Sequence, residues 1–115
     1  AMTSYRARDN LLDKVRAEIQ QQMPQRPPQL ESVAEALGVK PWTLRRRLRA
    51  EDTDFSTLLD AERQQLARDW LLYSEHTISQ IATDLGYSEQ SAFNRAFRRW
   101  FGCTPVTWRE QHRRD

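Results

Sequence analysis

Apolar residues recur along this chain of 115 residues at intervals of three and four, which is the spacing of one face of an α-helix. Leu11, Val15 and Ile19 make the first apolar stripe. No segment alternates apolar and polar residues in the way that predicts a half-buried β-strand. The pattern therefore predicts an all-α fold of about seven helices.

Prolines, glycines and capping residues set the expected ends of these helices. Pro24 breaks the first helix, whereas Pro41 opens a later one, because the missing N–H of proline costs nothing in a first turn. Gly38 and Gly86 each end a helix, since glycine is common just past a helix end. Residues 77–80 (TISQ) form a capping-box pattern. The expected helices cover approximately residues 9–23, 30–37, 41–51, 55–73, 77–86, 89–101 and a short segment that opens at 104–105.

Several side chains are expected to take defined positions in these helices. Ser88 is expected to cap the sixth helix, and Asp54 or Thr53 the fourth. Val106 and Trp108 are expected to face inward from the seventh helix. The apolar face of the fourth helix is expected to consist of Phe55, Leu58, Leu59, Leu66, Trp70 and Tyr73.

The sequence contains an internal repeat. Residues 33–38 (VAEALG) recur as residues 81–86 (IATDLG), and each copy is followed by a short turn and a basic helix. Helix, glycine turn and helix is the plan of a helix-turn-helix, in which the second helix lies in the major groove of DNA. The predicted organisation is a disordered or cloning-derived N-terminus (1–8), a first helix-turn-helix subdomain (9–53), a linker helix (54–74) and a second helix-turn-helix subdomain (75–115).

The two basic helices are expected to present equivalent outward faces. Successive helical residues turn by about 100°, so Leu44 and Leu48 point toward the core of the first helix-turn-helix. Phe93 and Phe97 do the same in the second. The opposite faces hold Trp42, Arg45, Arg46 and Arg49 in the first helix, and Ser91, Asn94, Arg95 and Arg98 in the second.

Charge is strongly segregated along the chain, although the net charge is only +2. Residues 40–49 hold five basic residues and no acid, and residues 93–99 hold three arginines and no acid. Residues 50–69 hold six acids against two arginines. The local field at the two basic helices would attract a polyanion. For Trp42 two interpretations stay open: contact with thymine methyls in a DNA groove, or packing against another part of the domain.

Several classes of function lack support in the sequence. The longest apolar run is residues 70–73, whereas a membrane span needs about 20 residues. The single Cys103 excludes an internal disulfide and suits a reducing compartment. No zinc-ligand spacing, glycine-rich phosphate loop or nucleophile–base pair is present. We therefore expect a cytoplasmic protein that is not an enzyme, without a metal, a cofactor or a membrane partner.

Residues 30–109 resemble the DNA-binding domain of the AraC/XylS family of bacterial transcription regulators. The most specific matching segments are Arg63, residues 78–82 (ISQIA), 86–88 (GYS), 91–97 (SAFNRAF) and 102–105 (GCTP). The resemblance implies two helix-turn-helix units joined by a long helix. The two recognition helices (about 41–51 and 89–101) would lie in adjacent major grooves of an asymmetric site on double-stranded DNA.

The resemblance also implies roles for individual residues. Arg46 and Arg95 occupy equivalent places in the two repeats and are the first candidates for base reading. Lys40 departs from the family pattern, which often has a capping serine here. The predicted base-reading residues are Trp42, Thr43, Arg45, Arg46, Gln90, Ser91, Asn94 and Arg95. The predicted phosphate contacts are Lys40, Arg49, Arg98 and Arg99.

Family resemblance suggests further partners for the protein. These are RNA polymerase and an N-terminal effector or dimerisation domain outside this chain, which by itself is expected to be a monomer. The sequence does not separate activation from repression. The alternative function is a helical protein-interaction module whose basic Trp42/arginine face docks an acidic partner, which would give weak and non-selective DNA binding.

Overall fold

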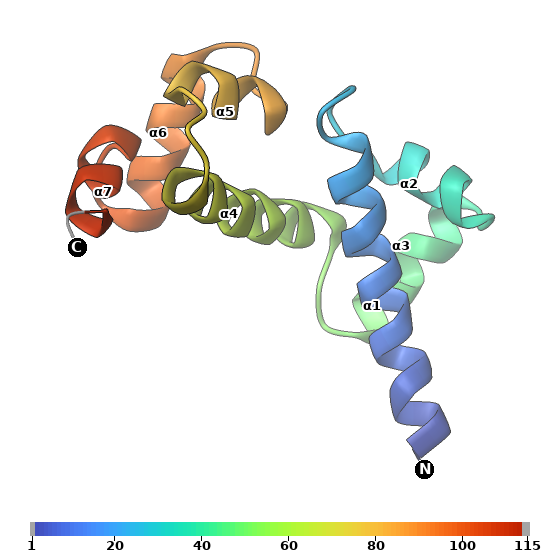
Figure 1. The fold of residues 1–115 in the computed structure, drawn as a ribbon. Coiled ribbons are helices and arrows are strands. Elements are labelled where there is room, and N and C mark those ends of the chain that lie inside the picture. Colours follow the sequence, from blue (N-terminus) through green and yellow to red (C-terminus); the bar gives the residue numbers. More distant parts are fainter. Residues whose placement is uncertain (1, 114–115) are drawn as a thin grey trace. The chain divides into compact units, whose positions relative to one another are not determined.

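The computed structural model describes residues 2–113, with side chains from Leu11 onward. Within this range the structure contains seven helices and no strand (Figure 1), which confirms the predicted all-α fold. None of these helices combines the length and the apolar character that crossing a membrane requires. The helices are α1 (Met2–Gln22), α2 (Leu30–Leu37), α3 (Pro41–Ala50), α4 (Phe55–Tyr73), α5 (Ile78–Asp84), α6 (Gln90–Phe101) and α7 (Pro105–His112).

The chain packs as two compact units, residues 1–62 and 63–115. The division falls inside α4, between Glu62 and Arg63. The first unit contains α1, α2, α3 and the start of α4, and the second contains the rest of α4 with α5, α6 and α7. The helix that the sequence analysis treats as a separate linker therefore contributes to both units.

Most helices begin and end at the capping and helix-breaking residues that the sequence predicts. α2 ends at Gly38, whose left-handed φ of 75° is a conformation that glycine adopts without strain. Asp54 caps α4, because its Oδ1 accepts a hydrogen bond from the Thr57 N–H at 2.8 Å. Thr77 and Gln80 form the predicted capping box of α5. The predicted end of α2 and the predicted starts of α4 and α5 are thus confirmed.

Two helix starts differ from the prediction. α1 begins at Met2 and not at Asp9, because residues 2–22 contain no proline or glycine that would stop the helix. Residues 2–8, which the sequence predicts to be disordered, are therefore helical. α6 begins at Gln90, since Glu89 still has an extended backbone (φ −142°, ψ 147°) and is the N-cap. The prediction that Ser88 caps this helix is wrong.

Two apolar side chains also differ from the prediction. Val106 is 49% exposed, because Pro105 and Trp108 occupy the buried positions of α7. Tyr73, the last residue of α4, is 82% exposed, whereas Leu71 is fully buried. Neither Val106 nor Tyr73 therefore belongs to the core.

The apolar face of α4 is only partly the predicted one. The buried residues are Leu58, Glu62, Ala67 and Leu71, which recur at intervals of four and five. One of these four buried residues, Glu62, is acidic, so the spacing of apolar residues alone does not identify the buried face of α4. The Glu62 carboxylate accepts a hydrogen bond from Gln20 Nε2 of α1, which satisfies its buried oxygen. The other predicted members, Phe55, Leu59, Leu66 and Trp70, are half-buried.

The core of the first unit joins α1, α2 and α3. Val15, Ile19, Val33, Leu44 and Leu48 are each at most 1% exposed. A polar contact ties α1 to α2 beside this core. The Gln22 amide donates to the Ser32 carbonyl at 3.2 Å and accepts from the Ser32 hydroxyl at 2.6 Å.

The core of the second unit is aromatic. Phe97 of α6 is fully buried, and its ring centroid lies 5.8 Å from that of Phe93, 4.7 Å from Phe101 and 6.0 Å from Trp108. Edge and tilted contacts of this kind add to the free energy that burial provides. They fix α6 against α7 and determine which side of α6 faces solvent.

Candidate nucleic-acid interface

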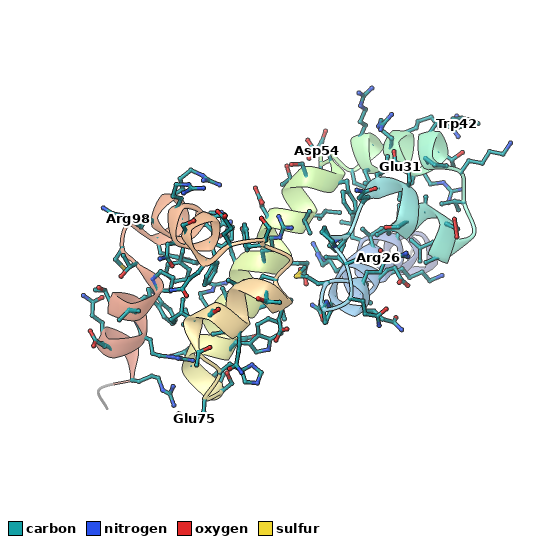
Figure 2. All side chains as sticks on the ribbon, turned by 90° about the horizontal axis from the view of Figure 1, so that it is seen from above. Arg26, Glu31, Trp42, Asp54, Glu75 and Arg98 are labelled. Atoms are coloured by element: carbon teal, nitrogen blue, oxygen red, sulfur yellow. The ribbon has the colours of Figure 1, made fainter. Side chains whose placement is uncertain are left out.

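α3 has one buried face and one exposed face. Leu44 and Leu48 lie in the core of the first unit, and Pro41 occupies the first turn of the helix. Trp42 is 57% exposed, and Figure 2 shows it at the outer surface of this unit. The predicted residues Lys40, Arg45, Arg46 and Arg49 are exposed, and Thr43 is half-buried.

The Trp42 ring does not pack into the domain but stacks with a neighbour on the same face. The guanidinium carbon of Arg46 lies 5.0 Å from the ring centroid. Such a cation–π contact at an exposed site contributes about 0.5–1 kcal/mol. It restricts the guanidinium to the outward face while its N–H donors stay available. The exposure of Trp42 argues against the interpretation that it packs elsewhere in the domain.

α6 is built in the same way. Phe93, Ala96 and Phe97 are buried, and the opposite side carries exposed polar and basic residues. Figure 2 shows Arg98 at the outer surface of the second unit. The exposed members of the predicted site are Gln90, Ser91, Arg95, Arg98 and Arg99.

Asn94 is placed less favourably for base reading than the sequence predicts. It is half-buried, and its Oδ1 atom is buried without a hydrogen-bond partner among the described residues. A bidentate contact with adenine needs both the oxygen and the nitrogen of the amide. Asn94 can make that contact only after its side chain has turned outward.

The basic residues of the predicted interface are not used in ion pairs within the part of the chain whose side chains are described. Within residues 11–113, no ion pair involves any of the seven basic residues assigned to it. These residues are Lys40, Arg45, Arg46, Arg49, Arg95, Arg98 and Arg99. The acids in the ion pairs that do form, such as Glu62 and Glu75, pair with other side chains. The positive charge on both faces is therefore available to an external anion.

Other arginines stabilise the second unit through hydrogen bonds to backbone carbonyls, and Arg63 is one of them. Its Nε donates a hydrogen bond to the Leu85 carbonyl at 3.0 Å, and its guanidinium lies 4.8 Å from the Tyr87 ring centroid. Arg63 thereby holds the turn between α5 and α6. The structure thus gives this residue of the matched segments a positioning role.

Arg109 of α7 holds the C-terminal end of α4. Its guanidinium donates hydrogen bonds to the backbone carbonyls of Trp70, Leu71, Ser74 and His76 at 2.8–3.2 Å. Trp70 and Leu71 lie in the last turn of α4, whereas Ser74 and His76 follow the helix, and the Trp70 carbonyl also accepts from the Ser74 N–H, so Arg109 adds to the hydrogen bonds at this helix end and ties α7 to it. Burial, together with the neighbouring positive charge of Arg113, lowers the pKa of Arg109.

Arg113 extends the same cluster. It donates to the Leu71 and Ser74 carbonyls and to the Glu75 carboxylate, the last at 2.7 Å. This hydrogen bond lowers the pKa of Glu75. Sequence reasoning missed the roles of Arg109 and Arg113. The basic residues near the end of α7 are a signal, but their acceptors lie more than 30 positions away.

A groove of about 400 Å³ lies beside α3 in the first unit. The sequence pattern did not predict it, because it forms where the turn between α3 and α4 meets the start of α2. It is lined by Leu30, Arg45, Leu48, Arg49, Thr53, Asp54, Phe55 and Ser56. The groove borders the outward face of α3, since two of its lining residues, Arg45 and Arg49, belong to that face.

The described side chains offer no obvious metal site. Among them, no three His, Cys, Asp or Glu residues come together as a possible set of ligands. His76 Nδ1 lies 4.0 Å from Asp84 Oδ2, in a polar pocket of about 280 Å³. Cys103 is half-buried and unpaired.

Comparisons with known proteins agree with this arrangement. The profile of the family described as "Helix-turn-helix domain" matches residues 33–111. The HTH-type transcriptional regulator VirS of Mycobacterium tuberculosis is 48% identical over 79 residues, which are 69% of this chain and 23% of VirS. The HTH-type transcriptional activator CsvR of Escherichia coli is 39% identical over 93 residues, which are 81% of this chain and 34% of CsvR. The chain thus spans only a part of the length of these relatives.

The fold also matches solved structures. A DNA-binding transcriptional dual regulator from Escherichia coli K-12 superposes with a TM-score of 0.83 at 28% identity. The match covers 91% of this chain and 94% of that one. Together with the profile match and the two relatives, this likeness shows that the chain belongs to the AraC-type family of helix-turn-helix DNA-binding domains, as the matched sequence segments predict.

Proposed function

We propose that this chain binds double-stranded DNA sequence-specifically, as the DNA-binding part of a bacterial transcription regulator in the cytoplasm. α3 and α6 would each enter a major groove. The observation that carries the proposal is the pair of outward faces at equivalent positions of the repeat. Both are basic and exposed, and neither uses its charges in ion pairs among the described side chains.

In the first half-site, Arg46 is the main base reader. Its stacking on Trp42 supports this role, because a guanidinium held in place loses less conformational freedom when it binds a guanine edge. Trp42 offers the rest of its ring to a thymine methyl. Thr43 and Arg45 read neighbouring bases, and Lys40 and Arg49 contact phosphates.

In the second half-site, Arg95 takes the place of Arg46. Gln90 and Ser91 extend the base-reading surface toward the start of α6, and Arg98 and Arg99 contact phosphates. Asn94 joins them only after the rotation described above. Because the residue types on α3 and α6 differ, the site is asymmetric.

The same proposal extends to partners outside this chain. The matched residues are 23% of VirS and 34% of CsvR, and the family resemblance suggests an N-terminal effector-binding or dimerisation domain as a partner outside this chain. RNA polymerase is the partner expected of an activator, and CsvR is named as one. The chain alone would bind DNA as a monomer, without catalysis.

Selection of bound duplexes from a random DNA pool, at about 150 mM salt, tests the proposal. We expect enrichment of one asymmetric site that contains two short blocks about one turn of DNA apart. Binding without any enrichment, and lost as the salt concentration rises, would contradict it. That outcome would favour the alternative protein-interaction module with an acidic partner.

A further inference from the structure

The N-caps of the two recognition helices carry opposite charges. Aligning Leu44 with Phe93 places Lys40 opposite Glu89 in the repeat. Both N-caps have an extended backbone, and neither side chain hydrogen-bonds to its own helix as a cap. The two residues share an extended backbone, although φ differs (−77° for Lys40 and −142° for Glu89), and their side chains carry opposite charges. A lysine suits a phosphate, whereas a glutamate there is repelled by phosphates.

The carboxylate of Glu89 lies next to the predicted base-reading face of α6. Its Oε2 accepts a hydrogen bond from the Ser91 hydroxyl at 3.3 Å. Among residues 11–113 the structure pairs this carboxylate with no cation, and the side chain is exposed. Oε1 thus has acceptor capacity for an external donor.

This hydrogen bond also determines whether the Ser91 hydroxyl can act as a donor or an acceptor toward a bound molecule. When the serine donates this hydrogen bond, its oxygen offers only lone pairs to other groups. Together, Glu89 and Ser91 form a surface of acceptors. In the major groove the only base donors are the amino groups of cytosine N4 and adenine N6. Adenine places its N7 acceptor beside that amino group, which disfavours a carboxylate, whereas the cytosine edge carries no acceptor of its own.

We infer that Glu89, oriented by Ser91, selects a cytosine in the half-site that α6 reads. The inference rests on the proposed DNA binding, and it adds a specificity-determining residue that the sequence analysis did not single out. The competing explanation is that Glu89 only complements the positive end of the α6 dipole. In that case the carboxylate would weaken binding to every DNA sequence alike and would prefer no base.

Site selection with the wild-type chain and two variants distinguishes these explanations. The wild type should enrich a cytosine in one block and bind it roughly 5- to 150-fold more tightly than sites with another base there. Glu89→Gln should reduce this preference to below about 3-fold, because its amide can also donate to guanine and adenine acceptors. Ser91→Ala should weaken the preference less, since the carboxylate stays but loses its orienting partner.

Glu110→Gln is the matched control. Glu110 is exposed on α7, and its substitution removes the same charge from the same unit without touching the α6 face. It should leave every base preference unchanged, and circular dichroism should show that all variants fold alike. If the wild type selects a site but Glu89→Gln keeps the same cytosine preference, the inference is wrong while the proposed function stands. If the wild type selects no site at all, both are wrong.

Discussion

The two proposed recognition helices, α3 and α6, differ in chemistry although they occupy equivalent places in the repeat. The outward side of α3 is dominated by arginines and one tryptophan, and the Lys40 N-cap adds another positive charge. At positions equivalent to Lys40, Trp42 and Arg45, the second repeat has Glu89, Ser91 and Asn94. Both helices keep an arginine at the next position, Arg46 in α3 and Arg95 in α6.

This difference suggests a division of labour within the repeat. Arginines and lysines attract DNA of any sequence, so α3 should supply more of the salt-dependent affinity. Hydroxyl, amide and carboxylate groups contribute little net attraction but distinguish base edges by their donors and acceptors. α6 should therefore depend more on hydrogen bonds. The repeated scaffold fixes where a side chain stands, and the residue type decides what it contributes.

The largest expected effect is on the free energy of unfolding of the second unit, whose core is aromatic. Phe97→Ala removes the ring that contacts Phe93, Phe101 and Trp108, and should lower the free energy of unfolding of the second unit by about 3–5 kcal/mol. Urea denaturation followed by tryptophan fluorescence measures the loss. Val106→Ala is the control, because Val106 is exposed and should cost less than about 0.5 kcal/mol. Similar costs for both substitutions would contradict the assignment of the core.

The next largest effect is on the free energy of DNA binding, and it should differ between the two half-sites. Arg46→Ala should weaken binding to the selected site by about 1–3 kcal/mol and relax base preference in one block only. Arg95→Ala should do the same in the other block. Equilibrium binding to site variants measures both effects. If either substitution weakens binding to all sequences equally, that arginine contacts phosphate and is not a base reader.

A smaller effect concerns the stacked pair on α3, which has no counterpart on α6. Trp42→Ala should lose about 0.5–1 kcal/mol of binding free energy, because Arg46 would then have to be ordered on binding, in addition to any contact of the ring with DNA. A double-mutant cycle with Arg46→Ala isolates the coupling. Trp42→Phe, which keeps an aromatic face, should retain part of it. Strict additivity of the two alanine substitutions would show that the stacking does not position Arg46.

The smallest effect is on acid stability and involves one carboxylate in each unit. The hydrogen bond from the Thr57 N–H lowers the pKa of Asp54, and the hydrogen bond from Arg113 lowers that of Glu75. A carboxylate whose pKa is lower in the folded state stabilises the fold above its unfolded pKa, and this contribution is lost as the pH falls through the folded pKa. Both groups are exposed, so solvent screens the contribution.

Denaturation at a series of pH values between neutrality and about pH 3 checks this expectation. Asp54→Asn and Glu75→Gln should each make stability fall less steeply in acid than it does in the wild type. Asp13→Asn is the control, since Asp13 is exposed on α1 and makes only a local contact with Arg16. An unchanged acid profile in both test variants would contradict the assigned contacts.

The fold was predictable from the sequence where local signals act alone. Gly38, Pro41 and the residues 77–80 define helix ends through their own backbone preferences, and the structure places those ends where they were expected. The α4 face was predicted less well, because this helix contributes to two units and buries Glu62 within its column. The spacing of apolar residues does not reveal a buried glutamate whose carboxylate accepts a hydrogen bond from another helix, as Glu62 does from Gln20.

The candidate site was predictable in outline, and its details depended on long-range contacts. Helical geometry placed Trp42 and the arginines of α3 on one exposed face, as the structure has them. The hydrogen bonds of Arg109 depend on packing between segments distant in sequence, which no local pattern encodes, and helical periodicity placed Asn94 on the outward face although its Oδ1 is buried.

The division of the chain inside α4 has a consequence for how such proteins can be rearranged. A cut between Glu62 and Arg63 would break a continuous helix and leave its backbone N–H and C=O groups without partners at two new ends. Recombination between related genes could exchange α3 or α6, but it could not transplant one whole unit without also preserving the helical register through the junction. Changes within α3 or α6 should therefore alter one predicted DNA-contacting face more readily than the exchange of a whole unit.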